Sequence, residues 1–351
     1  MTSTFGEQSL AAEHDCVLLD LDGTVYRGGA PTPGAVDVLA RNPIRRLFLT
    51  NNASRRPRDV AGHLRSMGFD VDSDDVVTSA QVAARLLADD LPVASTVLVI
   101  GTDALAAEVA DVGLLTMRSQ CDGPAAVVQG HSPHTDWGHL AEGALAIRDG
   151  ALWVACNADA TFPTERGLVP GNGAMIAALR AATGAAPVVA GKPAPHMMRA
   201  GLARREAESP LVVGDRLDTD IAGAVAAGLP SLLVLSGVST PSDLVCAGAE
   251  CRPTYVAEDL RGLARPAEAL RIRPQPGWHV DITADVVTVT AHDARSRDDL
   301  SVVRAVAQAM WDADLTIPPV RIAPGDASAR RALARWGLWN DAPTRSVGRQ
   351  R

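Results

Sequence analysis

The sequence is almost without lysine. Among its 351 residues, the 33 basic side chains are 32 arginines and one lysine, Lys192. The 41 acidic side chains outnumber them, so the formal net charge is −8. Proteins that bind nucleic acids or membrane surfaces generally neutralise phosphates with an excess of basic residues, which this chain lacks. We therefore expect no nucleic-acid partner, and any anionic ligand has to be held by a local arrangement of residues.

Long apolar runs, a basic N-terminus and paired cysteines are missing as well. No apolar run approaches the roughly 18 residues that would span a bilayer, which predicts a chain without a membrane span. Residues 1–26 contain no Lys or Arg, unlike a signal peptide. The cysteines are scattered without a Cys-X-X-Cys pair, which favours reduced thiols over disulfides or a zinc site. These absences predict a cytoplasmic protein. The five cysteines are Cys16, Cys121, Cys156, Cys246 and Cys251.

Short apolar runs do occur, and they alternate with alanine-rich segments of helical spacing. The predicted strands are residues 16–20, 46–50, 96–100, 125–129, 151–156, 187–190, 211–214 and 231–235. The predicted helices are residues 58–67, 79–88, 102–109, 171–182 and 219–227. Continuous apolar strands are typical of parallel sheets that helices cover on both faces. The fold class is therefore α/β, with a doubly wound, Rossmann-like parallel sheet.

The composition changes after Pro266. A passage rich in Pro, Gly and Arg is typical of a linker, and four of the six tryptophans lie beyond it. We predict a small α+β C-terminal domain over residues 272–351. It should contain one strand at 285–291 and helices around 299–313 and 327–336.

Two carboxylates follow the first predicted strand in the run Asp20-Leu21-Asp22-Gly23-Thr24. Alternate strand residues point the same way, so Asp20 and Asp22 should approach one spot at the carboxyl edge of the sheet, where open α/β folds bind ligands. Two crowded acids repel each other, which separates their proton affinities and allows one to act as nucleophile and the other as proton donor. The alternative is a turn that merely uses Asp and Gly.

Further polar groups follow other strands. Thr50, Asn51 and Asn52 end the second strand and could donate hydrogen bonds to phosphoryl oxygens, although such residues are also common in turns. Lys192 follows residues 187–190, and a chain that otherwise uses Arg indicates a site that needs a compact charge. Chance retention of one lysine is the alternative.

A third acidic group follows residues 211–214. Asp215, Asp218 and Asp220 suit a hard cation such as Mg²⁺, which prefers oxygen ligands. The pattern favours a metal role most strongly for Asp215. Asp218 and Asp220 could equally compensate the dipole of the next helix.

In this order, the motifs DLDGT, FLTNN, GKP and GDRLDTD resemble the phosphatase branch of the haloacid dehalogenase-like hydrolases. Residues 14–265 carry the resemblance, which is specific for the reaction class and much less so for the substrate. The nearest subfamily contains p-nitrophenyl, phosphoglycolate, glycerol 3-phosphate and pyridoxal phosphatases. Additional matching segments are PGA at 33–35, SR at 54–55, TSA at 78–80, GH at 130–131, NAD at 157–159, PGNG at 170–173 and GKPAP at 191–195.

The resemblance implies roles for these residues. Asp20 would attack phosphorus to form an aspartyl phosphate, while Asp22 would protonate the leaving group and then activate water. Mg²⁺ would be held by the Asp20 carboxylate, the Asp22 backbone carbonyl and Asp215. Phosphoryl oxygens would be bound by Thr50, Asn51, Asn52 and Lys192, with Asp220 and Asp218 in supporting positions.

It also implies two hydrolase-core segments, 14–79 and 188–265, separated by an inserted α/β cap at 80–187 that covers the site. His131, His134, Asp136 and Trp137 lie in this cap, where hydrogen bonding or a solvated surface is favoured over a metal site. Asn157 and Asp159 follow another cap strand, and the sequence does not show which cap residues touch substrate.

The subfamily favours a small phosphorylated metabolite, with glycerol 3-phosphate first, then 2-phosphoglycolate or pyridoxal phosphate. Pairing of similar phosphatases through their caps implies a possible homodimer.

Residues 329–338 resemble the closing helix of Gcn5-related acetyltransferases. The phosphate-cradling loop of those enzymes is absent, because Pro324 stands where a donor N–H is needed. We expect a partial, inactive acetyltransferase-like unit used for packing or association. An acyl-CoA-binding or regulatory protein is the alternative from another functional class.

Overall fold

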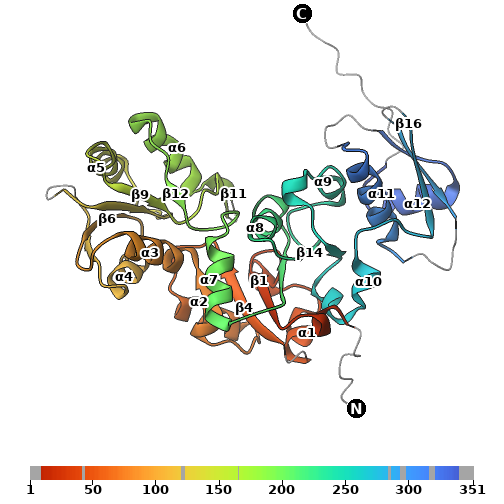
Figure 1. The fold of residues 1–351 in the computed structure, drawn as a ribbon, viewed down its shortest axis with the longest axis horizontal. Helices are drawn as coiled ribbons and strands as arrows, with labels where there is room; N and C mark the ends of the chain where they lie inside the picture. Colours follow the sequence, from red (N-terminus) through yellow and green to blue (C-terminus); the bar gives the residue numbers. More distant parts are fainter. Residues whose placement is uncertain are drawn as a thin grey trace, which may run out of the picture.

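The computed structural model describes residues 9–41, 44–119, 123–164, 166–283, 286–292, 298–315 and 321–339. Three groups of elements follow one another across the view in Figure 1, with a central sheet flanked by a second sheet and by a C-terminal unit. No helix in these ranges is long and apolar enough to cross a membrane. Four cysteines in these ranges are free thiols, whereas Cys121 lies outside the described residues.

The central sheet is parallel and has the order β15-β14-β13-β1-β4-β5. Its strands are β1 (Cys16–Asp20), β4 (Arg45–Thr50), β5 (Val76–Thr78), β13 (Pro210–Gly214), β14 (Ser231–Val234) and β15 (Tyr255–Ala257). Its helices are α1 (Ala35–Arg41), α2 (Pro57–Ser66), α3 (Ser79–Asp90), α7 (His196–Arg205), α8 (Ala222–Ala227), α9 (Pro241–Val245) and α10 (Ala267–Leu270). Alternate residues of β1 enter two different apolar clusters, Val17 and Leu19 on one face and Leu18 on the other, as a sheet covered on both sides requires.

The second sheet is also parallel, with the order β12-β9-β8-β6-β7. Its strands are β6 (Thr96–Ile100), β7 (Leu115–Met117), β8 (Ala126–Gln129), β9 (Leu152–Ala155) and β12 (Val188–Val189), with a hairpin of β10 (Thr161–Thr164) and β11 (Gly167–Pro170). Helices α4 (Asp103–Asp111), α5 (Trp137–Arg148) and α6 (Asn172–Thr183) accompany it. We expected residue 188 to begin the core, but Val188 and Val189 pair with β9 in this second sheet.

The described residues of the C-terminal unit form three strands where the sequence predicted one. They are β16 (Trp278–Thr283), β17 (Val286–Ala291) and β18 (Arg321–Pro324), and the helices are α11 (Ser301–Asp312) and α12 (Ala327–Arg335). Strand β17 pairs antiparallel with β16 and parallel with β18. The predicted strand position 285 and residues 340–351 of the predicted domain lie outside the described residues.

Candidate active site

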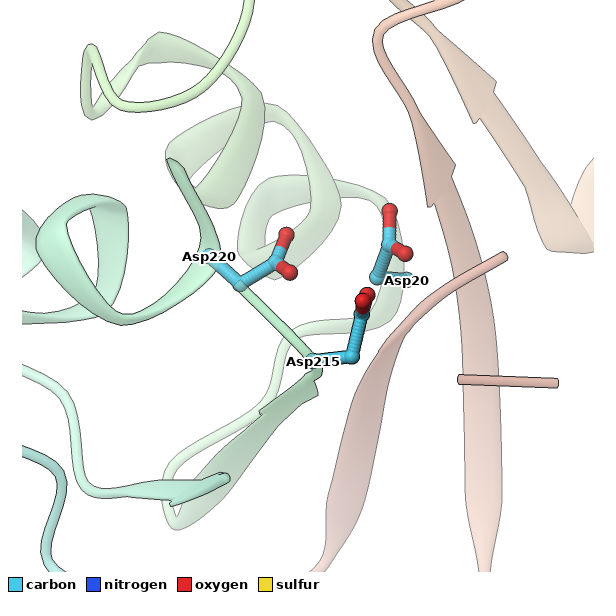
Figure 2. Close-up of side chains that lie close together, drawn as sticks. All are labelled: Asp20, Asp215 and Asp220. Carbon is cyan, nitrogen blue, oxygen red and sulfur yellow. The ribbon is translucent and has the colours of Figure 1, made fainter. Parts of the chain in front are cut away.

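Three buried or half-buried carboxylates meet at the carboxyl edge of the central sheet. Asp20 ends β1, Asp215 follows β13, and Asp220 lies in a π-helical segment, Leu217–Ile221. One oxygen of each lies within 4.8 Å of the others. Figure 2 shows their carboxyl groups facing one another, and we call Asp20, Asp215 and Asp220 the acidic cluster.

Lys192 provides an ammonium group at this cluster. Its Nζ donates to Asp20 Oδ1 and, over 2.7 Å, to Asp220 Oδ1, and the residue is only 3% exposed. Burial alone would lower the pKa of Lys192, but the two carboxylates outweigh it and raise this pKa. The lysine is therefore charged, and its one ammonium faces three carboxyl groups, so negative charge is in excess whenever all three are ionised.

The excess negative charge shows in the carboxyl groups themselves. Burial and then the nearby Asp220 carboxylate raise the pKa of Asp215 to about 6. The pKa of Asp20 is raised well above its usual value by burial, then by Asp220, with a further contribution from Asp215. We predicted that Asp22 would be the carboxylate that crowds Asp20. The structure corrects this, because the neighbouring acids are Asp220 and Asp215.

Asp22 lies at the solvent side of the site. Asp22 is an exposed residue, yet the surrounding protein shields its carboxyl group from part of the solvent, and this desolvation raises the pKa of Asp22. The Tyr26 hydroxyl donates to Asp22 Oδ2 over 3.3 Å and partly offsets this effect by stabilising the charged form. An exposed carboxyl group that keeps its proton to higher pH is suited to donate a proton to a leaving group.

Asp215 is held by a loop that the sequence analysis did not single out. The Val238 N–H donates to Asp215 Oδ2 over 2.6 Å, and the Ser239 N–H donates to the Asp215 carbonyl over 3.0 Å. A methyl group on Gly237 would lie 1.9 Å from Asp215 Oδ2, so only glycine permits this approach. We call residues 236–240 the Asp215-binding loop. The run Ser-Gly-Val-Ser directly after the predicted strand 231–235 could have pointed to this loop.

Gly23, in the DLDGT turn after β1, also packs against the Asp215 carboxylate. Its φ of +89° lies in the left-handed region, and a Cβ there would be 2.4 Å from Asp215 Oδ2. The Thr24 hydroxyl also donates to Asp215 Oδ1 over 3.4 Å. The DLDGT turn therefore helps to hold Asp215 as well as placing its own carboxylates.

Asn51, predicted to bind phosphate, has a side chain that joins two other segments. Its Oδ1 accepts from the Lys192 N–H over 2.8 Å, and its Nδ2 donates to the Lys192 carbonyl over 3.1 Å. The Asn51 amide also donates over 3.4 Å to Asp159, which lies in the loop after β9, and Asn157 Nδ2 donates to the Asn51 carbonyl over 2.7 Å. The side chain of Asn51 thus fixes the backbone of Lys192 and meets the predicted cap.

The two residues beside Asn51 also make local bonds. The buried Thr50 Oγ1 accepts from the Asn52 N–H over 3.1 Å. The exposed Asn52 uses its Oδ1 to accept from the Ser54 N–H over 2.7 Å, which is turn chemistry. The Asn52 side chain therefore serves the loop in this structure.

Asp218 is not brought into the acidic cluster. Its side chain is 68% exposed and forms an ion pair with Arg216 over 2.7 Å. The π-helical segment changes the angular spacing of residues, and it places Asp220 at Lys192 while Asp218 meets solvent. For Asp218 and Asp220 the sequence left the same two alternatives open, whereas the structure places only Asp220 in the acidic cluster.

The polar residues predicted in the cap also differ in whether they reach the site. Asp136 caps the N-terminus of α5 by accepting from the His139 N–H over 3.0 Å, and Trp137 is 82% exposed. Ser54 Oγ donates to the His131 carbonyl over 3.0 Å, whereas Asn157 and Asp159 reach Asn51. For this cluster, the described contacts are those of capping and hydrogen bonding.

Comparison with known proteins agrees with this geometry. Residues 17–115 match the model of the haloacid dehalogenase-like hydrolase family, and residues 189–263 match a second hydrolase model of the same kind. A D-glycerol 3-phosphate phosphatase of Mycobacterium tuberculosis is 56% identical over 352 residues, which cover 98% of this chain and 100% of that protein. The chain belongs to the haloacid dehalogenase-like hydrolases. It is a phosphatase of this family.

Other relatives place the hydrolase part of the chain within a wider group of phosphatases. An acid sugar phosphatase of Staphylococcus epidermidis is 36% identical over 252 residues, covering 70% of this chain and 95% of that protein. A solved 4-nitrophenylphosphatase of Thermotoga maritima has a TM-score of 0.68 at 31% identity, covering 73% and 98% of the two chains. The hydrolase resemblance predicted from the sequence is confirmed.

The C-terminal unit also has known relatives. Residues 275–338 match the model of a GCN5-related N-acetyltransferase-like domain, which confirms the predicted resemblance. The structure of a glycerol phosphate phosphatase of Mycobacterium tuberculosis in complex with magnesium has a TM-score of 0.91 at 56% identity. It covers 94% of this chain and 99% of that chain, so the likeness includes the hydrolase and the C-terminal unit together.

Proposed function

We propose that this hydrolase is a Mg²⁺-dependent phosphomonoesterase that converts glycerol 3-phosphate and water to glycerol and phosphate through a phosphoryl group on Asp20. The observation that carries the proposal is the acidic cluster bonded to the single lysine at the sheet edge. The 56% identity to a D-glycerol 3-phosphate phosphatase over almost the whole chain supports the choice of substrate.

The residues at the site fit Mg²⁺. A hard divalent cation needs oxygen ligands, and the acidic cluster offers three carboxyl groups against the single positive charge of Lys192. Asp20 and Asp215 would hold the ion, together with the backbone carbonyl of Asp22. When bound, Mg²⁺ would neutralise charge on the phosphoryl group and keep both carboxylates ionised.

The first step uses three side chains. An Asp20 carboxylate oxygen attacks phosphorus, the bond from phosphorus to the glycerol oxygen breaks, and Asp22 gives its proton to that oxygen. Lys192 stabilises negative charge on the transferring group, because its buried ammonium already lies at Asp20. The products of this step are glycerol and a phosphorylated Asp20.

The second step restores the enzyme. The ionised Asp22 takes a proton from a water molecule, whose oxygen attacks phosphorus and releases inorganic phosphate from Asp20. Asp22 ends protonated and Asp20 ends as a carboxylate, so the cycle is balanced. The exposed position of Asp22 suits this exchange with water and leaving group.

A substrate panel tests the proposal. We expect kcat/KM for glycerol 3-phosphate to exceed the values for 2-phosphoglycolate and pyridoxal phosphate, the alternative substrates of the subfamily. Asp20→Asn should abolish Mg²⁺-dependent phosphate release from all of them while the melting temperature stays near that of the wild type. A preference for another phosphomonoester would replace the substrate, whereas turnover by Asp20→Asn would refute the mechanism.

The alternative prediction, acyl-CoA binding by the C-terminal unit, finds no support at the start of α12. The N–H groups of Ser328 and Ala329 both donate to Asp326 Oδ1, over 2.7 and 2.8 Å. This carboxylate occupies donors that would otherwise face a pyrophosphate, and its charge repels one. Titrating acetyl-CoA into the full-length protein should therefore give no heat of binding.

We also propose a cytoplasmic homodimer. The four free cysteines of the described residues are consistent with a reducing compartment. Exposed apolar side chains on α5, Trp137 at 82% and Leu145 at 51%, support pairing through this part of the molecule. Sedimentation velocity should show a dimer that Trp137→Glu converts to a monomer, and a monomeric wild type would contradict the proposal.

A further inference from the structure

The C-terminal unit and the hydrolase core share one apolar cluster. From the core, the cluster includes residues of β14, β15, α9 and the π-helical segment, and from the described part of the C-terminal unit it includes residues of β16, β17, β18, α11 and α12. Its core members include Leu217, Ile221, Leu233, Leu244 and Val245, and its C-terminal members include Val287, Val302, Val306, Met310, Ile322 and Leu333. The unit is therefore not a tethered separate domain, because its interior continues into that of the core.

Helix α9 is the element through which this packing reaches the active site. Trp311 Nε1 of α11 donates to the Leu244 carbonyl of α9 over 3.2 Å, and the guanidinium of Arg252 lies 5.3 Å from the centre of the Trp311 ring. Helix α9 begins directly after the Asp215-binding loop, and Figure 1 shows α9 and α11 next to each other. Movement of α9 would therefore move the loop.

A second connection runs through the π-helical segment that carries Asp220. Leu217 and Ile221, which flank Asp220, are buried in the shared cluster. The Leu217 N–H donates to Ser239 Oγ over 3.0 Å, so this segment and the Asp215-binding loop are also bonded to each other. The π-helical segment and α9, which follows the Asp215-binding loop, thus both pack in the same apolar cluster.

We propose that the C-terminal unit is a brace for the metal site, and that Trp311 is a positioning residue that sets the affinity for Mg²⁺ through α9 and the Asp215-binding loop. This inference rests on the proposed function for the identity of the ion. The brace acts by holding the Val238 N–H and Gly237 against Asp215, so that the carboxylate is oriented before the ion binds. Among the described residues, Trp311 forms no hydrogen bond to the acidic cluster, and its indole N–H bonds to α9 instead.

Two matched substitutions test the brace. Trp311→Phe removes the hydrogen bond to α9, whereas Trp336→Phe removes an equivalent bond, from Trp336 Nε1 to the Asp299 carbonyl over 2.6 Å, inside the C-terminal unit. We expect calorimetric titration of MgCl₂ into the metal-free protein to show a Kd raised about threefold to tenfold by Trp311→Phe. For Trp336→Phe the Kd should stay within about twofold of the wild type.

Hydrogen exchange supplies a readout that needs neither metal nor turnover. In metal-free Trp311→Phe, peptides covering residues 217–221 and 236–240 should exchange faster than in the wild type, and in Trp336→Phe they should not. Unchanged Mg²⁺ affinity and exchange in Trp311→Phe, or equal changes in both variants, would overturn the brace. Failure of the proposed function would appear in the wild type instead, as absence of Mg²⁺-dependent phosphate release, and the exchange rates would still decide the brace.

Discussion

The second sheet and the C-terminal unit both share an apolar cluster with the hydrolase core, but they differ in what their polar groups reach. Asn157 and Asp159 beside the second sheet bond to Asn51, which itself holds the backbone of Lys192. The C-terminal unit bonds to α9 through Trp311, and the loop that precedes α9 holds Asp215. Substitutions in the first region should alter substrate handling, and those in the second should alter metal affinity.

We expect the largest loss of kcat/KM from substitution of Lys192, at the edge of the central sheet that both regions adjoin through hydrogen bonds. Lys192 is buried against Asp20, Asp220 and the Leu49 carbonyl, a space shaped for a compact ammonium. Lys192→Arg should therefore lower kcat/KM by about 100-fold or more, nearly as much as Lys192→Ala. Steady-state assays at saturating Mg²⁺, with melting temperatures to show folding, measure this. Retention of near wild-type activity by the arginine variant would show that charge alone is enough.

The pH dependence of kcat should reveal proton donation by Asp22, a step that depends on neither the second sheet nor the C-terminal unit. A raised pKa keeps the Asp22 proton to higher pH, so kcat for glycerol 3-phosphate should fall about tenfold per pH unit above that pKa. p-Nitrophenyl phosphate has a leaving group that needs no proton, and its first step should not show this fall. Pre-steady-state bursts of nitrophenol measured across the pH range provide the comparison. Parallel pH profiles for the two substrates would argue against Asp22 as the acid.

A smaller effect is expected in the second sheet. Asp159→Asn keeps the size of the side chain but removes the charged acceptor for the Asn51 amide, and kcat/KM should fall about tenfold. The affinity for Mg²⁺ should stay unchanged. Asp103→Asn is the matched control, because Asp103 is fully exposed and pairs with Arg118. Equal effects of the two substitutions would remove the distinction between the regions.

The smallest effect should come from Asp218. Its exposed ion pair with Arg216 contributes about 1 kcal/mol at most, and it lies outside the acidic cluster. Asp218→Ala should leave the Mg²⁺ requirement within about twofold of wild type, whereas Asp220→Ala should raise it by about tenfold or more. Metal titrations of both variants decide whether the π-helical segment separates these two acids functionally.

The sequence predicted that several polar side chains would meet at one edge of the sheet, because parallel strands bring their carboxyl ends together. Asp20, Lys192 and Asp215 each follow an apolar run, and the structure places all three at one site. The single lysine was a second signal, because a chain that otherwise uses Arg indicated a need for a compact charge at residue 192, and the structure buries Lys192 between Asp20 and Asp220.

The remainder depended on tertiary contacts that local patterns do not contain. Asn51 bonds to Lys192, 141 residues away, so its pairing could not be read from the TNN motif alone. Strand β16 lies at the end of a passage whose Pro and Gly indicated a linker, and β18 is short and ends at Pro324. The outward position of Asp218 follows from a π-helical segment that propensities do not predict.

The central claim is that phosphoryl transfer passes through Asp20 at this metal-dependent edge. The direct measurement is rapid acid quenching of the enzyme during turnover of glycerol 3-phosphate with Mg²⁺, followed by mass spectrometry of its peptides. We expect one phosphoryl group on Asp20, which disappears when Mg²⁺ is removed and is absent in Asp20→Asn. A phosphoryl group on another residue, or turnover by Asp20→Asn, would contradict it.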